Sequence, residues 1–145
     1  MRLFLIAGTV LFLFACKKEA LETDLSLLQK QRKIWENQRI DSYKIDQQMS
    51  CFCPNALVAI FTCTIENGIL VTVDDQPYDA GQHAYLKTID AVFDYLEKRL
   101  ENNPDHFSVN YDATYGFPVD FYIDQSEMIA DEEIGYTFSN FRSLE

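Results

Sequence analysis

The chain has 145 residues, with 23 acidic against 12 basic side chains and a formal net charge of −11. This length suits one domain, and a hydrophobic content of 48% with 14% aromatic residues excludes a disordered acidic tail, which lacks apolar groups to bury. The acidic balance argues against nucleic-acid binding, which depends on Lys and Arg side chains that neutralise phosphates.

The first fifteen residues have the pattern of an export signal. Arg2 precedes an apolar run from Leu3 to Phe14, which is shorter than the roughly twenty residues of a membrane-spanning helix. A charged start, a short apolar middle and a small residue before the break are typical of secretory signals. The sequence therefore predicts a signal peptide over residues 1–15, cleaved before Cys16.

The segment Leu13–Cys16 at this break resembles the lipobox of bacterial lipoproteins. The resemblance implies that the Cys16 sulfur carries a diacylglycerol and that the new amino terminus is acylated. Several acyl chains anchor a protein durably, because each buried methylene contributes about 0.8 kcal/mol. Lys17 follows Cys16, which favours the outer membrane as the destination. The excess of acidic side chains repels anionic headgroups, so the lipid is expected to hold the protein at the membrane.

After the signal, residues 16–23 are predicted to be the lipidated cysteine and a short polar tether, and residues 24–145 a single domain. From Asp24 to Arg39 the chain is rich in good helix formers, and apolar residues recur at spacings of three and four. Trp35 lies on this apolar stripe, so it is expected to anchor the helix in the core.

Three strands are predicted next. Apolar and polar residues alternate over Ser42–Cys53, which is strand periodicity. The segments Ala56–Ile65 and Ile69–Val73 flank Asn67-Gly68, a dipeptide typical of two-residue hairpin turns because both residues tolerate positive φ. A polar loop is expected over Asp74–Gln82.

A second helix is predicted to begin after Thr88 and to end at 102–104, where two asparagines precede a proline. Alternation then predicts three more strands, over Phe107–Tyr111, Phe117–Ile123 and Ile134–Phe138. The order α-βββ-α-βββ predicts an α+β fold. Its antiparallel sheet has about six strands, and both helices pack on one face.

Several short motifs follow one another along the chain: Trp35, Tyr43, Cys51-Phe52-Cys53-Pro54, Asn67-Gly68, Thr88-Ile89-Asp90-Ala91-Val92-Phe93, Tyr111-Asp112, Tyr115-Gly116-Phe117-Pro118, Asp124 and Ala130-Asp131-Glu132-Glu133. Through them, residues 35–141 resemble a bacterial lipoprotein family catalogued as domain of unknown function 6174 (DUF6174). The motifs after residue 110 are the most specific. The resemblance implies an envelope-exported domain of unassigned activity.

Three cysteines remain once Cys16 carries lipid: Cys51, Cys53 and Cys63. An exported protein meets an oxidising environment, so one disulfide with one thiol left over is expected. Cys51 and Cys53 could close a small ring, while a looser crossing would allow Cys63 to pair with either. A thiol redox or metal-binding module on these residues is the alternative function. Tetrahedral zinc needs four ligands at a different spacing, so no metal site is predicted.

No catalytic triad, phosphate loop or dinucleotide fingerprint occurs in the sequence, and no catalytic residue or cofactor is predicted. The carboxylates after residue 111 are interpreted as a solvated surface, with Asp112 capping its own turn. An exposed binding patch is predicted at Tyr115, Phe117 and Tyr122, which lie in a loop or out of phase with the core. The leading hypothesis is a lipid-anchored envelope protein that binds an unidentified envelope partner through this patch.

Overall fold

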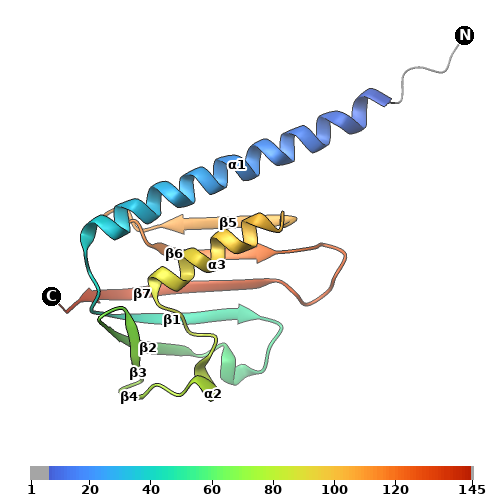
Figure 1. Cartoon of the computed structure of the whole chain (residues 1–145). Helices are drawn as coiled ribbons and strands as arrows, with labels where there is room; N and C mark the ends of the chain where they lie inside the picture. The colour runs from blue at the N-terminus through green and yellow to red at the C-terminus, as the bar shows by residue number, and fades with distance from the viewer. Residues whose placement is uncertain (1–6, 145) are drawn as a thin grey trace, which may run out of the picture.

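The computed structural model describes residues 7–144, with side chains from residue 19 onward except that of Ala56. Two long helices, α1 (Ala7–Gln38) and α3 (Ile89–Glu101), cover one face of an antiparallel sheet (Figure 1). The sheet has seven strands in the order β4-β3-β2-β1-β7-β6-β5. The strands are β1 (Tyr43–Cys51), β2 (Ile60–Glu66), β3 (Ile69–Val73), β4 (Gln76–Pro77), β5 (His106–Tyr111), β6 (Pro118–Asp124) and β7 (Ile134–Ser143).

The predicted α+β class and the placement of both helices on one face are confirmed. The loop expected over residues 74–82 contains two short elements, β4 and the helix α2 (Ala80–His83), and a 3-10 turn, η1 (Asn55–Leu57), follows β1. Helix α1 begins before the predicted start at Asp24, so the segment predicted as a tether, 16–23, is helical. Within the described residues, no helix combines the length and the apolar character that a membrane crossing requires.

Helix α3 follows the sequence pattern closely. Thr88 caps it, since its Oγ1 accepts a hydrogen bond from the Ala91 amide at 3.2 Å. The Tyr43 hydroxyl on β1 accepts a second one from the Ile89 amide at 2.8 Å, which ties the helix start to the sheet. One stripe of the helix is buried: Ile89, Val92, Phe93, Leu96 and Leu100.

Helices α1 and α3 are also joined by charged side chains. The Arg32 guanidinium on α1 lies 2.8 Å from the Asp94 carboxylate and 3.5 Å from that of Glu97, both on α3. Arg32 also pairs with Glu36 one turn along its own helix, at 3.1 Å. These pairs are partly exposed, so they orient the two helices more than they stabilise the fold.

Candidate functional site

Three motif residues, Trp35, Tyr43 and Asp90, meet where α1, α3 and β1 join. Trp35 is buried on α1, and its Nε1 donates a hydrogen bond to the Asp90 carboxylate at 3.1 Å. Its ring makes edge-on contacts with Tyr43, Phe117 and Phe141, at centroid distances of 5.6, 5.9 and 5.9 Å. The expectation that Trp35 anchors the core is therefore confirmed.

The turn between β5 and β6 fits against α1. The Asp112 carboxylate accepts hydrogen bonds from the amides of Thr114 and Tyr115, at 2.8 and 2.7 Å, so it caps its own turn as predicted. Gly116 has φ +80°, and a Cβ there would lie 2.8 Å from the Ile34 Cβ. Pro118 is buried opposite Tyr111, the tyrosine that begins the motif. The turn at Gly116 therefore packs directly against α1.

The half-buried Tyr111, at the end of β5 before this turn, has a raised pKa. Burial and the nearby negative charge of Asp24 raise its pKa to about 12, so its hydroxyl stays protonated at neutral pH. The tyrosine therefore acts here as a neutral packing residue.

The last two motif positions lie around the β6–β7 connection. Asp124 ends β6 opposite His106, and one of its carboxylate oxygens is buried without a hydrogen-bond partner among the described residues. Asp131 adopts a positive φ of 66° in this connection. Asp120, another acidic residue of β6, accepts a hydrogen bond from the side-chain amide of Asn110 at 2.9 Å.

The prediction of an exposed aromatic patch at Tyr115, Phe117 and Tyr122 is wrong. Phe117 is only 2% exposed, because it packs in the core against Trp35 and Phe141. Tyr115 is half-buried in the same cluster, stacked near Phe117. Tyr122 is exposed, but its cross-strand partners Ser108 and Gly135 place it on the opposite, open face of the sheet. The three residues therefore do not form one surface.

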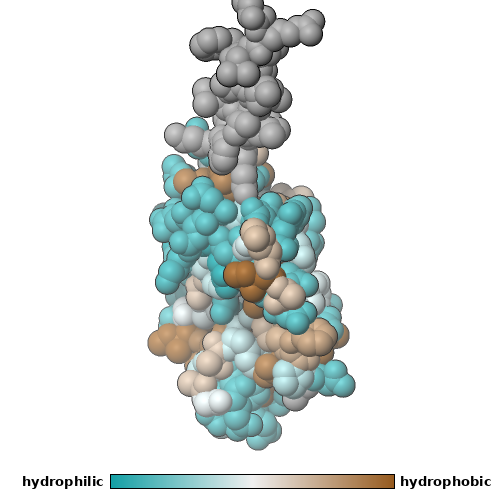
Figure 2. Space-filling model, turned by 90° about the vertical axis from the view of Figure 1, so that its right-hand side faces the viewer, coloured by the Kyte–Doolittle hydropathy of each residue, from teal (hydrophilic) through white to brown (hydrophobic). Residues whose placement is uncertain are grey.

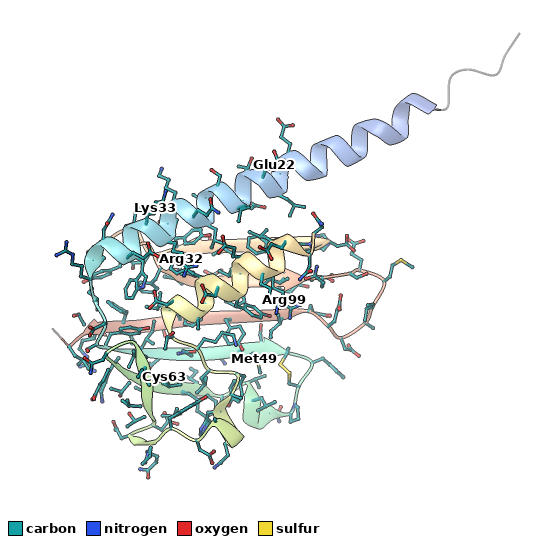
Figure 3. All side chains as sticks on the ribbon, viewed as in Figure 1. Glu22, Arg32, Lys33, Met49, Cys63 and Arg99 are labelled. Atoms are coloured by element: carbon teal, nitrogen blue, oxygen red, sulfur yellow. A yellow bond between two sulfur atoms is a disulfide. The ribbon has the colours of Figure 1, made fainter. Side chains whose placement is uncertain are left out.

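The cysteines separate into a pair and a lone thiol. Cys51 and Cys53 form a disulfide at the end of β1, with Cα atoms 5.2 Å apart. Cys63 is paired in register with Ile45, six residues before Cys51, which corresponds to about 20 Å along the strand. Burial raises the Cys63 pKa to about 12, so this thiol stays protonated. Figure 3 shows Cys63 in the sheet away from the end of β1.

The three sulfur atoms thus do not converge as a metal site would require. Among the described residues, no group of three His, Cys, Asp or Glu side chains is placed to hold a metal ion. Cys16, the predicted lipidation site, lies in α1, and its side chain is outside the described residues.

The open face of the sheet carries a hollow where β1, β2 and β7 meet. Its volume is about 560 Å³, and its polar lining comes from Lys44, Asp46, Thr62, Asn140 and Arg142. Asp46 forms the centre of the polar contacts, since it accepts hydrogen bonds from the Thr62 hydroxyl at 2.7 Å and the Asn140 amide at 2.8 Å.

A β-bulge creates this hollow. Lys44 pairs with Arg142 and Asp46 pairs with Ser139, so β7 contains one residue more than β1 between these pairs. Asn140 takes up the extra residue with φ 53° and reaches Asp46 on the open face, while Phe141 packs in the core. The bulge therefore adds a polar side chain to the open face without removing an aromatic one from the core.

Two positive charges lie next to each other at the hollow, and their repulsion opposes folding. Lys44 and Arg142 are direct cross-strand neighbours, and like charges in that position destabilise a sheet. Lys44 forms an ion pair with the exposed Asp75 at 3.1 Å, whereas Arg142 has no ion pair within residues 7–144. A chain with nearly twice as many acids as bases thus places two cations side by side.

The residues that line this hollow are not among those predicted from the sequence. Lys44 and Asp46 are recognisable as the outward positions of an alternating strand, but their closeness to Arg142 depends on strand order and on the bulge. One signal was present: Ser139-Asn140 puts two polar residues between Phe138 and Phe141, and this break in alternation is typical of a bulge.

Together these features define an α+β domain with one covered face, one open face and a polar hollow on the open face. The model of a family of unknown function, DUF6174, matches residues 27–143, so the chain belongs to this family. No curated protein and no solved structure matches the chain.

Proposed function

We propose that this chain is a lipid-anchored cell-envelope protein that binds the anionic group of an envelope partner at the open-face hollow. The neighbouring cations Lys44 and Arg142 are the observation that carries the proposal. Both cations line one hollow, and two such donors suit a carboxylate or phosphate, which would cancel their mutual repulsion. Asn140 and Thr62 would add polar contacts at the rim.

The membrane anchor in this proposal is the lipid expected on Cys16. The lipobox resemblance of Leu13–Cys16 and the short apolar run before it support this anchor. An acidic domain held by a lipid would leave its open face available to a partner in the envelope.

Site-specific photo-crosslinking tests the binding role. A benzophenone amino acid replaces Thr62 at the rim of the hollow, and the acylated protein is irradiated in its own envelope. We expect one dominant adduct, which falls by about tenfold or more in the double variant Lys44→Gln and Arg142→Gln, because each charge-assisted contact contributes about 1.5–3 kcal/mol.

A matched control removes two lysines from the exposed side of α1. The double variant Lys30→Gln and Lys33→Gln changes the net charge equally, so its adduct should be unchanged. Equal adduct yields in both double variants, or no adduct at position 62, would contradict binding at the hollow.

The second candidate function is thiol–disulfide exchange at Cys51–Cys53. The bond joins residues only two apart, and closing so short a loop stabilises the fold by about 1.5 kcal/mol, against about 3 kcal/mol for fifteen residues. Its position at a strand end, beside the exposed Phe52, suits attack by a partner thiolate. Two thiols of a partner protein would be oxidised to a disulfide as Cys51 and Cys53 gain the two hydrogens.

Thiol counting on the folded protein tests this exchange. After mild treatment with dithiothreitol and a maleimide, mass spectrometry should show two labels, on Cys51 and Cys53, with Cys63 unlabelled because it is buried and protonated. The Cys63→Ala variant should give the same two labels. Labels that appear only after denaturation would rule out an exchange role in the folded state.

A further inference from the structure

Exposed large apolar side chains are concentrated at one end of the sheet. At that end, Phe52 is 81% exposed and Met128 is 93% exposed; Ile129, which follows Met128, and Ile60, which pairs with Gln48 near the end of β1, are also exposed. These four residues are called the apolar loop end below. Figure 2 views the molecule from this side and shows several hydrophobic patches set among hydrophilic surface.

Strand pairing places the members of the apolar loop end together. Cys51, the last residue of β1, pairs with Ile134, the first residue of β7. The connection after β1, which carries Phe52, and the connection before β7, which carries Met128 and Ile129, therefore leave neighbouring strands at the same end. The disulfide adjoins this end and holds Phe52 between its two cysteines.

The N-terminal part of helix α1 extends beyond the same end of the sheet (Figure 1). It has 32 residues, a length of roughly 48 Å, and β1 has 9 residues, or roughly 30 Å. Ala20 and Leu21 of α1 lie beside His106 and Phe107, which begin β5 at this end, so the helix passes the sheet end near Glu19. Cys16 follows within one further turn. A lipid on Cys16 would thus enter the membrane close to the apolar loop end.

We propose that the apolar loop end rests on the surface of the lipid bilayer that holds the Cys16 lipid. This inference rests on the proposed lipid anchor and adds a second, non-covalent membrane contact to it. A helix that is continuous through residues 16–23 gives the domain a short connection, so the loop tips lie within reach of the headgroups. Apolar side chains at loop tips are suited to the boundary between headgroups and acyl chains.

The negative charge beside the apolar loop end indicates which lipid headgroups it can contact. Glu127, Asp131, Glu132 and Glu133 lie in the same connection as Met128, and Glu127 is paired with His106 at 2.5 Å. Carboxylates at the contact repel anionic headgroups. The apolar loop end therefore fits a surface of zwitterionic headgroups without net charge, with the apolar tips inserted and the acids left in water.

Tryptophan quenching by brominated lipids measures the contact. Acylated full-length Phe52→Trp protein is reconstituted into phosphatidylcholine vesicles whose acyl chains carry bromine near the headgroup. The native Trp35 is buried, so it supplies a constant background. We expect about a twofold loss of the added emission, because interfacial side chains reach 5–10 Å into the boundary that bromine occupies.

The matched control is Ile69→Trp. Ile69 is similarly apolar and 65% exposed, but it follows the Asn67-Gly68 turn at the opposite end of the sheet. Its emission should be unaffected by bromine. Equal emission losses in the two variants, or none in Phe52→Trp, would overturn the proposed orientation. Replacing about a third of the lipid with phosphatidylglycerol should reduce the Phe52→Trp quenching at low salt, and stronger quenching would contradict the charge argument.

Separate readouts distinguish this inference from the anchor itself. Mass spectrometry of residue 16 and flotation of the protein with vesicles test the anchor, and quenching is read on the protein that floats. Acylated protein that floats without quenching contradicts the membrane contact alone. Protein that lacks the acyl mass and does not float contradicts both proposals.

Discussion

Replacing Gly116 with alanine is expected to destabilise the folded chain by about 2–4 kcal/mol. Two effects add at this position. A φ of +80° is strained for any residue with a Cβ, and the added Cβ would lie 2.8 Å from the Ile34 Cβ and 2.9 Å from the Gln31 carbonyl oxygen on α1. A helix backbone cannot give way as a flexible side chain can, so the turn or the whole helix has to shift.

Gly68 supplies the control for this substitution. It has nearly the same φ, +75°, in the β2–β3 hairpin, but a Cβ there would meet no atom within 4 Å. Gly68→Ala should therefore cost only the backbone strain, about 1–2 kcal/mol. Urea denaturation of both variants measures the difference. Equal losses would show that the close approach to α1 contributes nothing.

The Trp35→Ala variant should lose about 3–5 kcal/mol in its free energy of unfolding, the range for a large buried aromatic residue. Trp35 is 2% exposed and contacts three aromatic rings that belong to β1, β6 with its preceding turn, and β7. Its removal leaves a cavity under α1 and also breaks the bond from Nε1 to Asp90. Thermal and urea denaturation, followed by near-ultraviolet circular dichroism, measure the loss.

Trp35→Phe separates the ring from the hydrogen bond. This variant keeps an aromatic ring in the cluster but cannot donate to Asp90, so a smaller loss of about 1–2 kcal/mol is expected. Leu27→Ala, at an exposed position of the same helix, should stay within about 0.5 kcal/mol of the parent. A Phe variant as unstable as the Ala variant would assign most of the effect to the hydrogen bond.

Elements governed by local rules could be predicted from the sequence. The α3 helix has a threonine cap and an apolar stripe of the right period, and both occur in the structure as expected. The Asn67-Gly68 turn adopts positive φ at both residues for the same reason. In these cases the deciding contacts lie within a few residues of one another along the chain.

The candidate site could not be predicted in this way, because it depends on non-local pairing. The last strand was predicted to end at Phe138, since alternation breaks there, but the bulge restores the phase and β7 continues to Ser143. That continuation brings Arg142 beside Lys44. Phe117 is predicted as exposed from a position at a loop or out of phase with the core, whereas the α1 helix packs over it and buries it.

The two edges of the sheet have unequal capacity for self-association. At one edge, β4 has only two residues, and one of them is Pro77, which has no amide hydrogen to donate. At the other edge, the six residues of β5 offer a longer row of backbone groups. Edge-to-edge contact between chains is therefore expected to favour β5 over β4. A β5-to-β5 pair uses the long edge of both chains, so such an assembly closes at two copies rather than growing into a fibre.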